Sequence, residues 1–86
     1  MQTIDYRRTY WGHNFVSYEP RVKGTDFHIL CWNHTRISEG DFVLWKTTYG
    51  WLAAEVVKVK PYLDPPDMYA IDVKVVRRYD HGGDEL

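Results

Sequence analysis

The residues from 69 to 75 alternate strictly between two kinds of side chain, and this pattern constrains the fold most. The odd positions are apolar or aromatic, being Tyr69, Ile71, Val73 and Val75. The even positions, Ala70, Asp72 and Lys74, are small or charged. Successive side chains of a β-strand point to opposite faces of its sheet, so a period of two predicts a half-buried strand that ends around residues 77–79.

Short segments of similar character recur along the chain, separated by turn residues. We expect strands over residues 12–18, 25–32, 42–45 and 51–60, with a turn at 38–41 and a hairpin connection at 47–50. Residues 3–11 form either a further strand or a loose arm. The sequence therefore predicts an all-β, mainly antiparallel fold with little or no helix, built as one strongly bent sheet or a five-stranded barrel.

The segment 51–60 changes its hydrophobic phase partway along. Leu52, Ala54 and Val56 share one parity, whereas Val57 and Val59 share the other. A β-bulge near residues 55–57 reconciles the two halves, because one extra residue reverses the side on which later side chains lie. Such a bulge also bends a strand, as the curvature of a small barrel requires.

The chain has 86 residues, which is room for one domain. We assign residues 1–79 to a β-barrel-like domain, with 1–11 as its arm or first strand, and expect the acidic residues 80–86 to be a flexible tail. Cys31 is the only cysteine, and residues 1–8 do not resemble a signal peptide. We therefore expect a cytoplasmic protein without an internal disulfide and without membrane contact.

Aromatic residues form 16% of the chain, more than so small a core needs. We expect one or two tryptophans to be buried with an apolar set, namely Phe42, Leu44, Val57, Ile71, Val73 and Val75. The surplus rings then lie on the surface, and Trp45, Tyr49 and Trp51 gather around one hairpin tip. Exposed aromatic residues near arginine are typical of protein interfaces, so we expect a protein-binding module, such as an inhibitor or an adaptor, and leave self-association open.

A nucleic-acid or nucleotide-binding barrel is the alternative. Arginines and rings interleave near Arg7, Arg8 and Trp11 and again near Arg77 and Arg78, as in surfaces that bind single strands. The formal net charge of −1 argues against a protein that coats duplex nucleic acid.

Metal binding and catalysis have weaker support. His28, Cys31 and His34 have a spacing that zinc ligands can adopt, with His13 as a fourth nitrogen. Strand alternation, however, places His28 and Cys31 on opposite faces. We therefore expect surface histidines and a buried thiol, no metal and no other cofactor. No catalytic motif is present, so we expect a protein that is not an enzyme.

Residues 37–45 and 50–59 together read as a Gly-Asp turn, a strand, a hairpin and a second strand. This stretch resembles the small β-barrels of PUA-like, Tudor-like and KOW-like domains, which implies a barrel fold. The Gly-x-Lys-x-x-Glu-x-Arg element of the ASCH branch is absent from the sequence, so the resemblance implies no catalytic or ligand residues here. The short, aromatic-rich chain also resembles orphan proteins encoded by bacteriophages.

Overall fold

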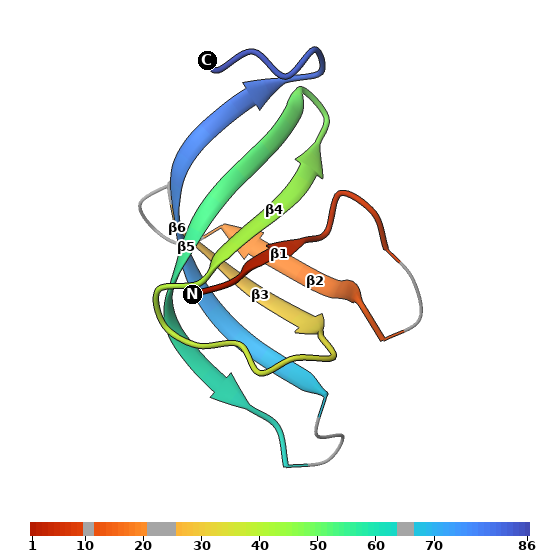
Figure 1. The fold of residues 1–86 in the computed structure, drawn as a ribbon, viewed down its shortest axis with the longest axis vertical. Coiled ribbons are helices and arrows are strands. Elements are labelled where there is room, and N and C mark those ends of the chain that lie inside the picture. The colour runs from red at the N-terminus through yellow and green to blue at the C-terminus, as the bar shows by residue number, and fades with distance from the viewer. Residues whose placement is uncertain (10–11, 21–25, 64–66) are drawn as a thin grey trace.

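Six β-strands and no helix lie in the described residues of the computed structural model, which are 1–9, 12–20, 26–63 and 67–86 (Figure 1). Only the backbone is described for residues 16 and 18. The strands are β1 (Thr3–Asp5), β2 (Asn14–Pro20), β3 (Asp26–Trp32), β4 (Phe42–Thr47), β5 (Gly50–Pro61) and β6 (Met68–Asp80). They form one sheet in the order β1-β4-β5-β6-β3-β2. The pair β1–β4 is parallel, and the other four pairs are antiparallel.

The prediction of an all-β, mainly antiparallel and strongly bent sheet is confirmed. The sheet curls into a half-barrel rather than a five-stranded barrel. The sixth strand is β1, so the first residues form a strand at the sheet edge rather than a loose arm. Its three residues gave no clear strand pattern because only Ile4 is buried among them.

The long hairpin of β5 and β6 is the spine of the fold (Figure 1). Near one end Trp51 pairs with Tyr79, and at the other Pro61 pairs with Tyr69. We call these the Trp51 end and the Tyr69 end. Strand β4 pairs with the first half of β5, whereas β3 pairs with the first half of β6. Each end of the spine is therefore extended by a different pair of strands.

The spine bends where its register shifts, between Ala53 and Ala54 and again between Val56 and Lys58. The second shift confirms the bulge predicted near residues 55–57. Val57 is its extra residue and is 48% exposed, so the expectation that Val57 belongs to the core is wrong. Val59 returns to the inner face and packs against the core, as the change of phase predicted.

The core lies on the inner face of the curled sheet. Phe42 and Leu44 are only half-buried, and the prediction that they belong to the core is wrong. The reason is the parity of β4, which turns Val43 and Trp45 inward instead. The predicted alternation of residues 69–75 is confirmed, with Val75 partly buried. The largest side chains that are almost fully buried are Ile29, Cys31, Ile37, Val43, Trp45, Val56, Ile71 and Val73.

Side chains bridge the open side of the half-barrel between β1 and β2. The His13 Nε2 atom lies 2.7 Å from the carbonyl oxygen of Asp5, and the Tyr6 hydroxyl donates to the carbonyl of Trp32 at 2.7 Å. The Tyr6 ring stacks on His13 at a centroid distance of 4.5 Å and also contacts Phe15. The two edge strands are thus joined by side-chain contacts.

Two terminal segments are held by hydrogen bonds. The Asp41 carboxylate accepts from the backbone N–H of Gln2 at 3.0 Å and of Ser38 at 2.9 Å, which fastens the first residues to the predicted turn at 38–41. Residues 80–86, expected to be a flexible tail, fold back on β6, where the Leu86 N–H donates to Arg78 at 2.8 Å. Asp80 makes this return possible by accepting bonds from Gly82 and Asp84.

Candidate functional site

A stack of three side chains lies on the outer face at the Trp51 end. The rings of Trp51 and Tyr79 are almost parallel, with centroids 3.8 Å apart and an interplanar angle of 13°. The Arg7 guanidinium carbon lies 4.5 Å from the centroid of the Trp51 ring. Strands β6 and β1 lie on opposite sides of β5 in the sheet order, so Tyr79 and Arg7 approach the indole from opposite sides. Both faces of the Trp51 ring are therefore in contact with protein.

The backbone register produces this stack. Trp51 and Tyr79 are direct cross-strand partners, and such pairs bring side chains on the same face into contact. Gly50, the preceding residue, has a φ of 153° and pairs with Asp80. A Cβ atom at Gly50 would collide with the backbone carbonyl of Tyr79, so only glycine allows the close approach of β5 and β6 at this point.

Asp5 fixes the position of Arg7. The Asp5 carboxylate accepts hydrogen bonds from Arg7 Nε at 2.9 Å and Nη2 at 2.8 Å, and from the Arg7 backbone N–H at 2.9 Å. The side-chain hydrogen bonds from Arg7 are the main cause of an Asp5 pKa below its ordinary value. A bidentate hydrogen bond of this kind fixes the plane of the guanidinium, and a fixed plane is what stacking on an indole requires.

Lys46 completes a row across the outer face, because it pairs with Trp51 from the β4 side. We call the surface formed by Asp5, Arg7, Lys46, Trp51 and Tyr79 the Trp51 patch. Lys46 is exposed, Trp51 and Tyr79 are half-buried, and the Arg7 side chain is 35% exposed. The patch therefore offers ring edges, one held cation and one exposed cation to a partner.

The predicted hairpin-tip site of Trp45, Tyr49 and Trp51 is only partly on the surface. Trp45 is 1% exposed, and the expectation that it is a surface residue is wrong. Neighbouring strand positions face opposite sides, so Lys46 faces outward with Trp51 and Trp45 faces the core. There Phe15 and Phe27 meet the Trp45 ring edge-on, with centroids 5.9 Å and 5.6 Å away. Tyr49 is 82% exposed in the hairpin turn, as predicted.

Among the described residues, the predicted nucleic-acid residues do not form one surface. Arg7 belongs to the Trp51 patch, and Arg8 beside it is exposed. Trp11 lies outside the described residues. Arg77 shares the outer face with Tyr79 and lies 3.6 Å from Glu85, whereas Arg78 lines a hollow with Phe27 and Leu86.

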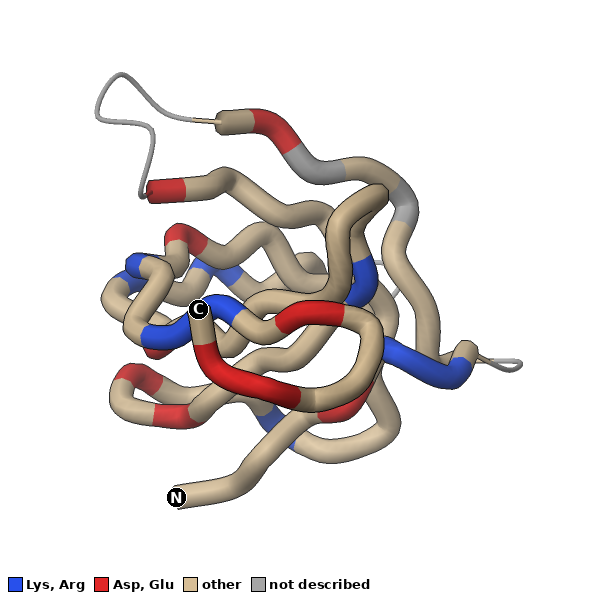
Figure 2. Tube along the Cα trace, turned by 90° about the horizontal axis from the view of Figure 1, so that it is seen from above, with Lys and Arg blue, Asp and Glu red and all other residues tan. Residues whose placement is uncertain are grey.

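Charges of both signs are also mixed along the described trace at this end. Figure 2 shows segments of Lys and Arg interspersed with segments of Asp and Glu around the C-terminus. The two basic groups predicted from the sequence are therefore accompanied by carboxylates.

The residues considered for metal binding are placed apart. His28 lies on the outer face with its Nδ1 atom 2.7 Å from Asp72, whereas Cys31 is fully buried on the inner face. Burial raises the pKa of the Cys31 thiol to about 11, which disfavours the reactive thiolate. His34 is exposed, and His13 bridges β1 and β2. Within the described ranges, no group of three or more His, Cys, Asp or Glu side chains is suited to a metal ion.

Three members of the Trp51 patch, Asp5, Lys46 and Tyr79, were not among the predicted site residues, and Lys46 was not singled out at all. Tyr79 was treated as the end of a strand and Asp5 as part of an undefined segment. Tyr79 carries a usable signal, since strands of the expected lengths that pair across the connection after Pro61 align it opposite Trp51. Asp5 has a local one, because an Asp side chain often accepts from the backbone N–H two residues further on in a turn, as Asp5 does from Arg7.

Comparisons with family models, curated proteins and solved structures found no match to this chain. The resemblances to PUA-like, Tudor-like and KOW-like domains and to bacteriophage proteins therefore stay predictions, as does the cytoplasmic location. In the part of the chain that the structure describes, no helix is long and apolar enough to cross a membrane.

Proposed function

We propose that this chain is a small protein-binding module whose partner docks on the Trp51 patch and on Tyr49. The observation that carries the proposal is the stack of Arg7, Trp51 and Tyr79 on the outer face. Tryptophan, tyrosine and arginine are the residues most enriched among those that dominate the binding energy of protein interfaces. An inhibitor or an adaptor is the kind of protein that works through such a surface.

The stack favours a protein partner because it is assembled before binding. Arg7 is held by Asp5 and by the indole, so docking would not have to order a long side chain. Ordering such side chains costs about 0.5–1.5 kcal/mol each when an interface forms. The neighbouring Tyr49 is 82% exposed and adds a large ring that a partner can cover.

The same geometry disfavours the nucleic-acid alternative at this place. A base stacks on a free ring face, and both faces of Trp51 are covered by Arg7 and Tyr79. Near the stack, Arg7 and Arg77 have carboxylate partners, whereas Lys46 has no ion pair with a described residue. The local charge is thus small for a surface that binds phosphates.

The test compares capture of partner proteins from a lysate of the source cells by immobilised wild type and three variants. Trp51→Ala and Tyr49→Ala remove the proposed contacts. Tyr62→Ala is the matched control, because Tyr62 is an exposed tyrosine near the other end of β5. Each variant is first checked for wild-type circular dichroism and a cooperative thermal transition.

We expect the wild type and Tyr62→Ala to retain the same proteins, and Trp51→Ala and Tyr49→Ala to lose them. Truncation of a dominant interface residue costs about 2 kcal/mol or more, which is about 30-fold in affinity. Full retention by both patch variants would contradict the proposal. Loss of every captured component on nuclease treatment would instead favour the nucleic-acid alternative, and a change of sedimentation with concentration would favour self-association.

A further inference from the structure

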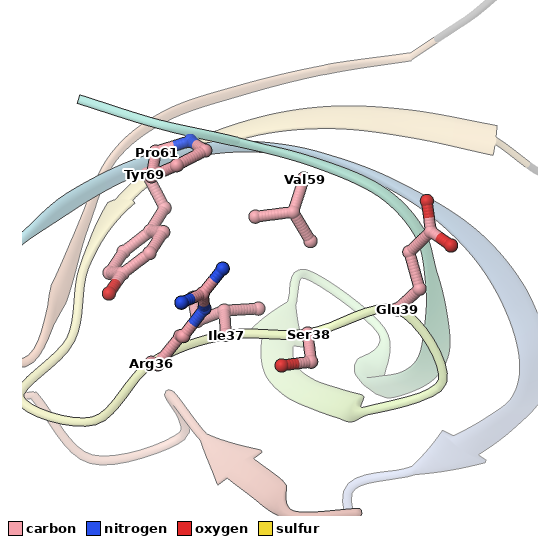
Figure 3. A pocket seen from close by; sticks show the side chains of 7 residues that line it. All are labelled: Arg36, Ile37, Ser38, Glu39, Val59, Pro61 and Tyr69. Carbon is pink, nitrogen blue, oxygen red and sulfur yellow. The ribbon is translucent and has the colours of Figure 1, made fainter.

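A cavity of about 580 Å³ opens at the Tyr69 end, far along the spine from the Trp51 patch. It lies between the ends of β5 and β6 and the loop that precedes β4 (Figure 3). Its lining residues are Arg36, Ile37, Ser38, Glu39, Val59, Pro61 and Tyr69. Its volume is within the range of about 300–1,000 Å³ that is usual for small-molecule sites.

The polar group that points to a ligand is the Tyr69 hydroxyl. Tyr69 is 93% buried, since only 7% of it is exposed, and its side chain lines the cavity. Among the described residues, the hydroxyl has no hydrogen-bond partner. Buried tyrosine hydroxyls usually find one, so an accessible hydroxyl in a cavity is a site at which a ligand atom can complete the bond.

Arg36 supplies the charge. Its guanidinium rises from the loop into the space between Tyr69 and Val59 (Figure 3), and it forms no ion pair with any described residue. Its backbone carbonyl is held by the side-chain amide of Gln2 at 2.6 Å, so the loop is fastened while the side chain remains available. An unpaired guanidinium beside an unpaired hydroxyl is a donor set for a carboxylate.

The remaining walls define the rest of the ligand. Ile37, Val59 and Pro61 form an apolar lining beside the two donors. Glu39 lies on the opposite side of the cavity from Tyr69 (Figure 3) and adds one negative charge. That charge disfavours a phosphate, which carries more than one negative charge at neutral pH, relative to a singly charged carboxylate.

We propose that this cavity binds a small monocarboxylate with an apolar body, whose carboxylate bonds to the Arg36 guanidinium and the Tyr69 hydroxyl. Its body lies against Val59 and Pro61. This site is independent of the proposed protein-binding function, because it shares no residue with the Trp51 patch.

The test is an NMR titration of the isotope-labelled full chain with cyclohexylacetate, with its neutral amide, cyclohexylacetamide, and with inorganic phosphate. We expect saturable shifts of the Arg36 side-chain N–H and the Val59 methyl groups with the carboxylate. The Trp51 indole N–H, at the other end, serves as an internal control and should not move. The amide should bind at least about tenfold more weakly, because it lacks the charge that Arg36 recognises.

Two variants assign the contacts. Arg36→Gln keeps most of the side-chain length but removes the charge, and we expect it to weaken carboxylate binding by about tenfold or more. Tyr69→Phe removes only the hydroxyl and should weaken it by at least about threefold. Arg8→Gln is the matched control, an exposed arginine that should leave binding unchanged.

The proposal is overturned if cyclohexylacetate gives no saturable shifts at millimolar concentrations, or if the amide binds as well as the acid. It is also overturned if either cavity variant binds like the wild type, or if phosphate binds more tightly than the carboxylate. Tyr69→Phe and Arg36→Gln change groups without described side-chain partners, so loss of the fold is not expected to obscure the result.

Discussion

The two ends of the β5–β6 spine differ in whether their arginine and tyrosine side chains have partners within the protein. At the Trp51 end, Arg7 is bonded to Asp5 and stacked on Trp51, and Tyr79 covers the other face of that ring. At the Tyr69 end, neither the Arg36 guanidinium nor the Tyr69 hydroxyl has a described partner. The first arrangement is a finished surface suited to a large partner, and the second is an incomplete set of donors suited to a small one.

The difference follows from where the sheet places the residues. Trp51 and Tyr79 are neighbours on the outer face of paired strands, so their rings meet without help from a loop. Tyr69 lies on the inner face, where the sheet has curled away from the loop that carries Arg36, and a cavity remains between them. Direct cross-strand pairing thus brings two rings together on the outer face, whereas a cavity remains between the inner face and the loop.

The largest expected effect is a difference in stability between variants of the inner and the outer tryptophan at the Trp51 end. Trp45→Ala leaves a large hole in the core and should lower the free energy of unfolding by about 3–5 kcal/mol. Trp51→Ala removes a ring stack and a cation–π contact on the surface and should cost about 1–2 kcal/mol. Urea unfolding followed by circular dichroism measures both. Equal losses would mean that the outer stack supports the fold as much as the core does.

The second effect concerns Cys31, which pairs with Tyr69 in the sheet and reports on the stability of that end. Burial raises its pKa to about 11, so at mildly alkaline pH its alkylation should be slower than that of a free thiol by about two orders of magnitude or more. Mass spectrometry of timed samples gives the rate. Protection should survive in Trp51→Ala, and its loss there would show that the two ends open together.

The third prediction tests what fastens the loop at the Tyr69 end. Burial by itself raises the pKa of Asp41, but hydrogen bonds from Gln2 and Ser38 outweigh it, and the pKa lies below its ordinary value. A carboxylate whose pKa is lower in the folded state than in the unfolded state stabilises the fold at pH values above its unfolded-state pKa. This stabilisation is lost as the pH falls through the folded-state pKa. Asp41→Asn should therefore cost about 1–2 kcal/mol at neutral pH.

The control for Asp41 is the pH dependence of that loss. The difference between the wild type and Asp41→Asn should shrink as acid protonates the wild-type carboxylate. Denaturant unfolding at neutral and at acidic pH measures it, and a difference that is constant across this range would exclude the ionised carboxylate as its source.

The smallest effect belongs to Asp5 at the Trp51 end. Hydrogen bonding to Arg7 lowers the Asp5 pKa, but the Asp5 side chain is 42% exposed, so water screens the pair. Asp5→Asn should change the free energy of unfolding by less than about 0.5 kcal/mol, and this difference should fall with added salt. Partner capture should nevertheless weaken, because Arg7 loses its orientation. Unchanged capture would remove Asp5 from the proposed site.

Much of the local structure was predictable from the sequence. The alternation of residues 69–75 and the phase change in 51–60 gave a strand and a bulge that the structure confirms, because the period of two acts within one strand. The prediction chose the wrong face of β4 for the core. Phe42 and Leu44 lie on one face and Val43 and Trp45 on the other, and the two pairs are equally apolar. A local pattern cannot choose between two such sets, and the core chose Trp45.

The candidate sites were less predictable because they join distant segments. Arg7 and Trp51 belonged to two separate predicted surfaces, one for nucleic acid and one for protein, and the sheet order brings them into one patch. Arg36 and Tyr69 were not predicted as site residues: Tyr69 was expected only as a position on the apolar face of a strand, and the cavity exists only between a loop and two strand ends.

The sequence by itself determined an all-β chain, most of its strand positions and the bulge that bends its spine, since each depends on side chains close together along the chain. Only the tertiary structure decided that β1 pairs in parallel with β4, that Trp45 is buried and that Arg7 stacks on Trp51. Those outcomes depend on which strands become neighbours. The neighbours of a strand are selected by the total burial and hydrogen bonding of the whole sheet, and these cannot be read from any single segment.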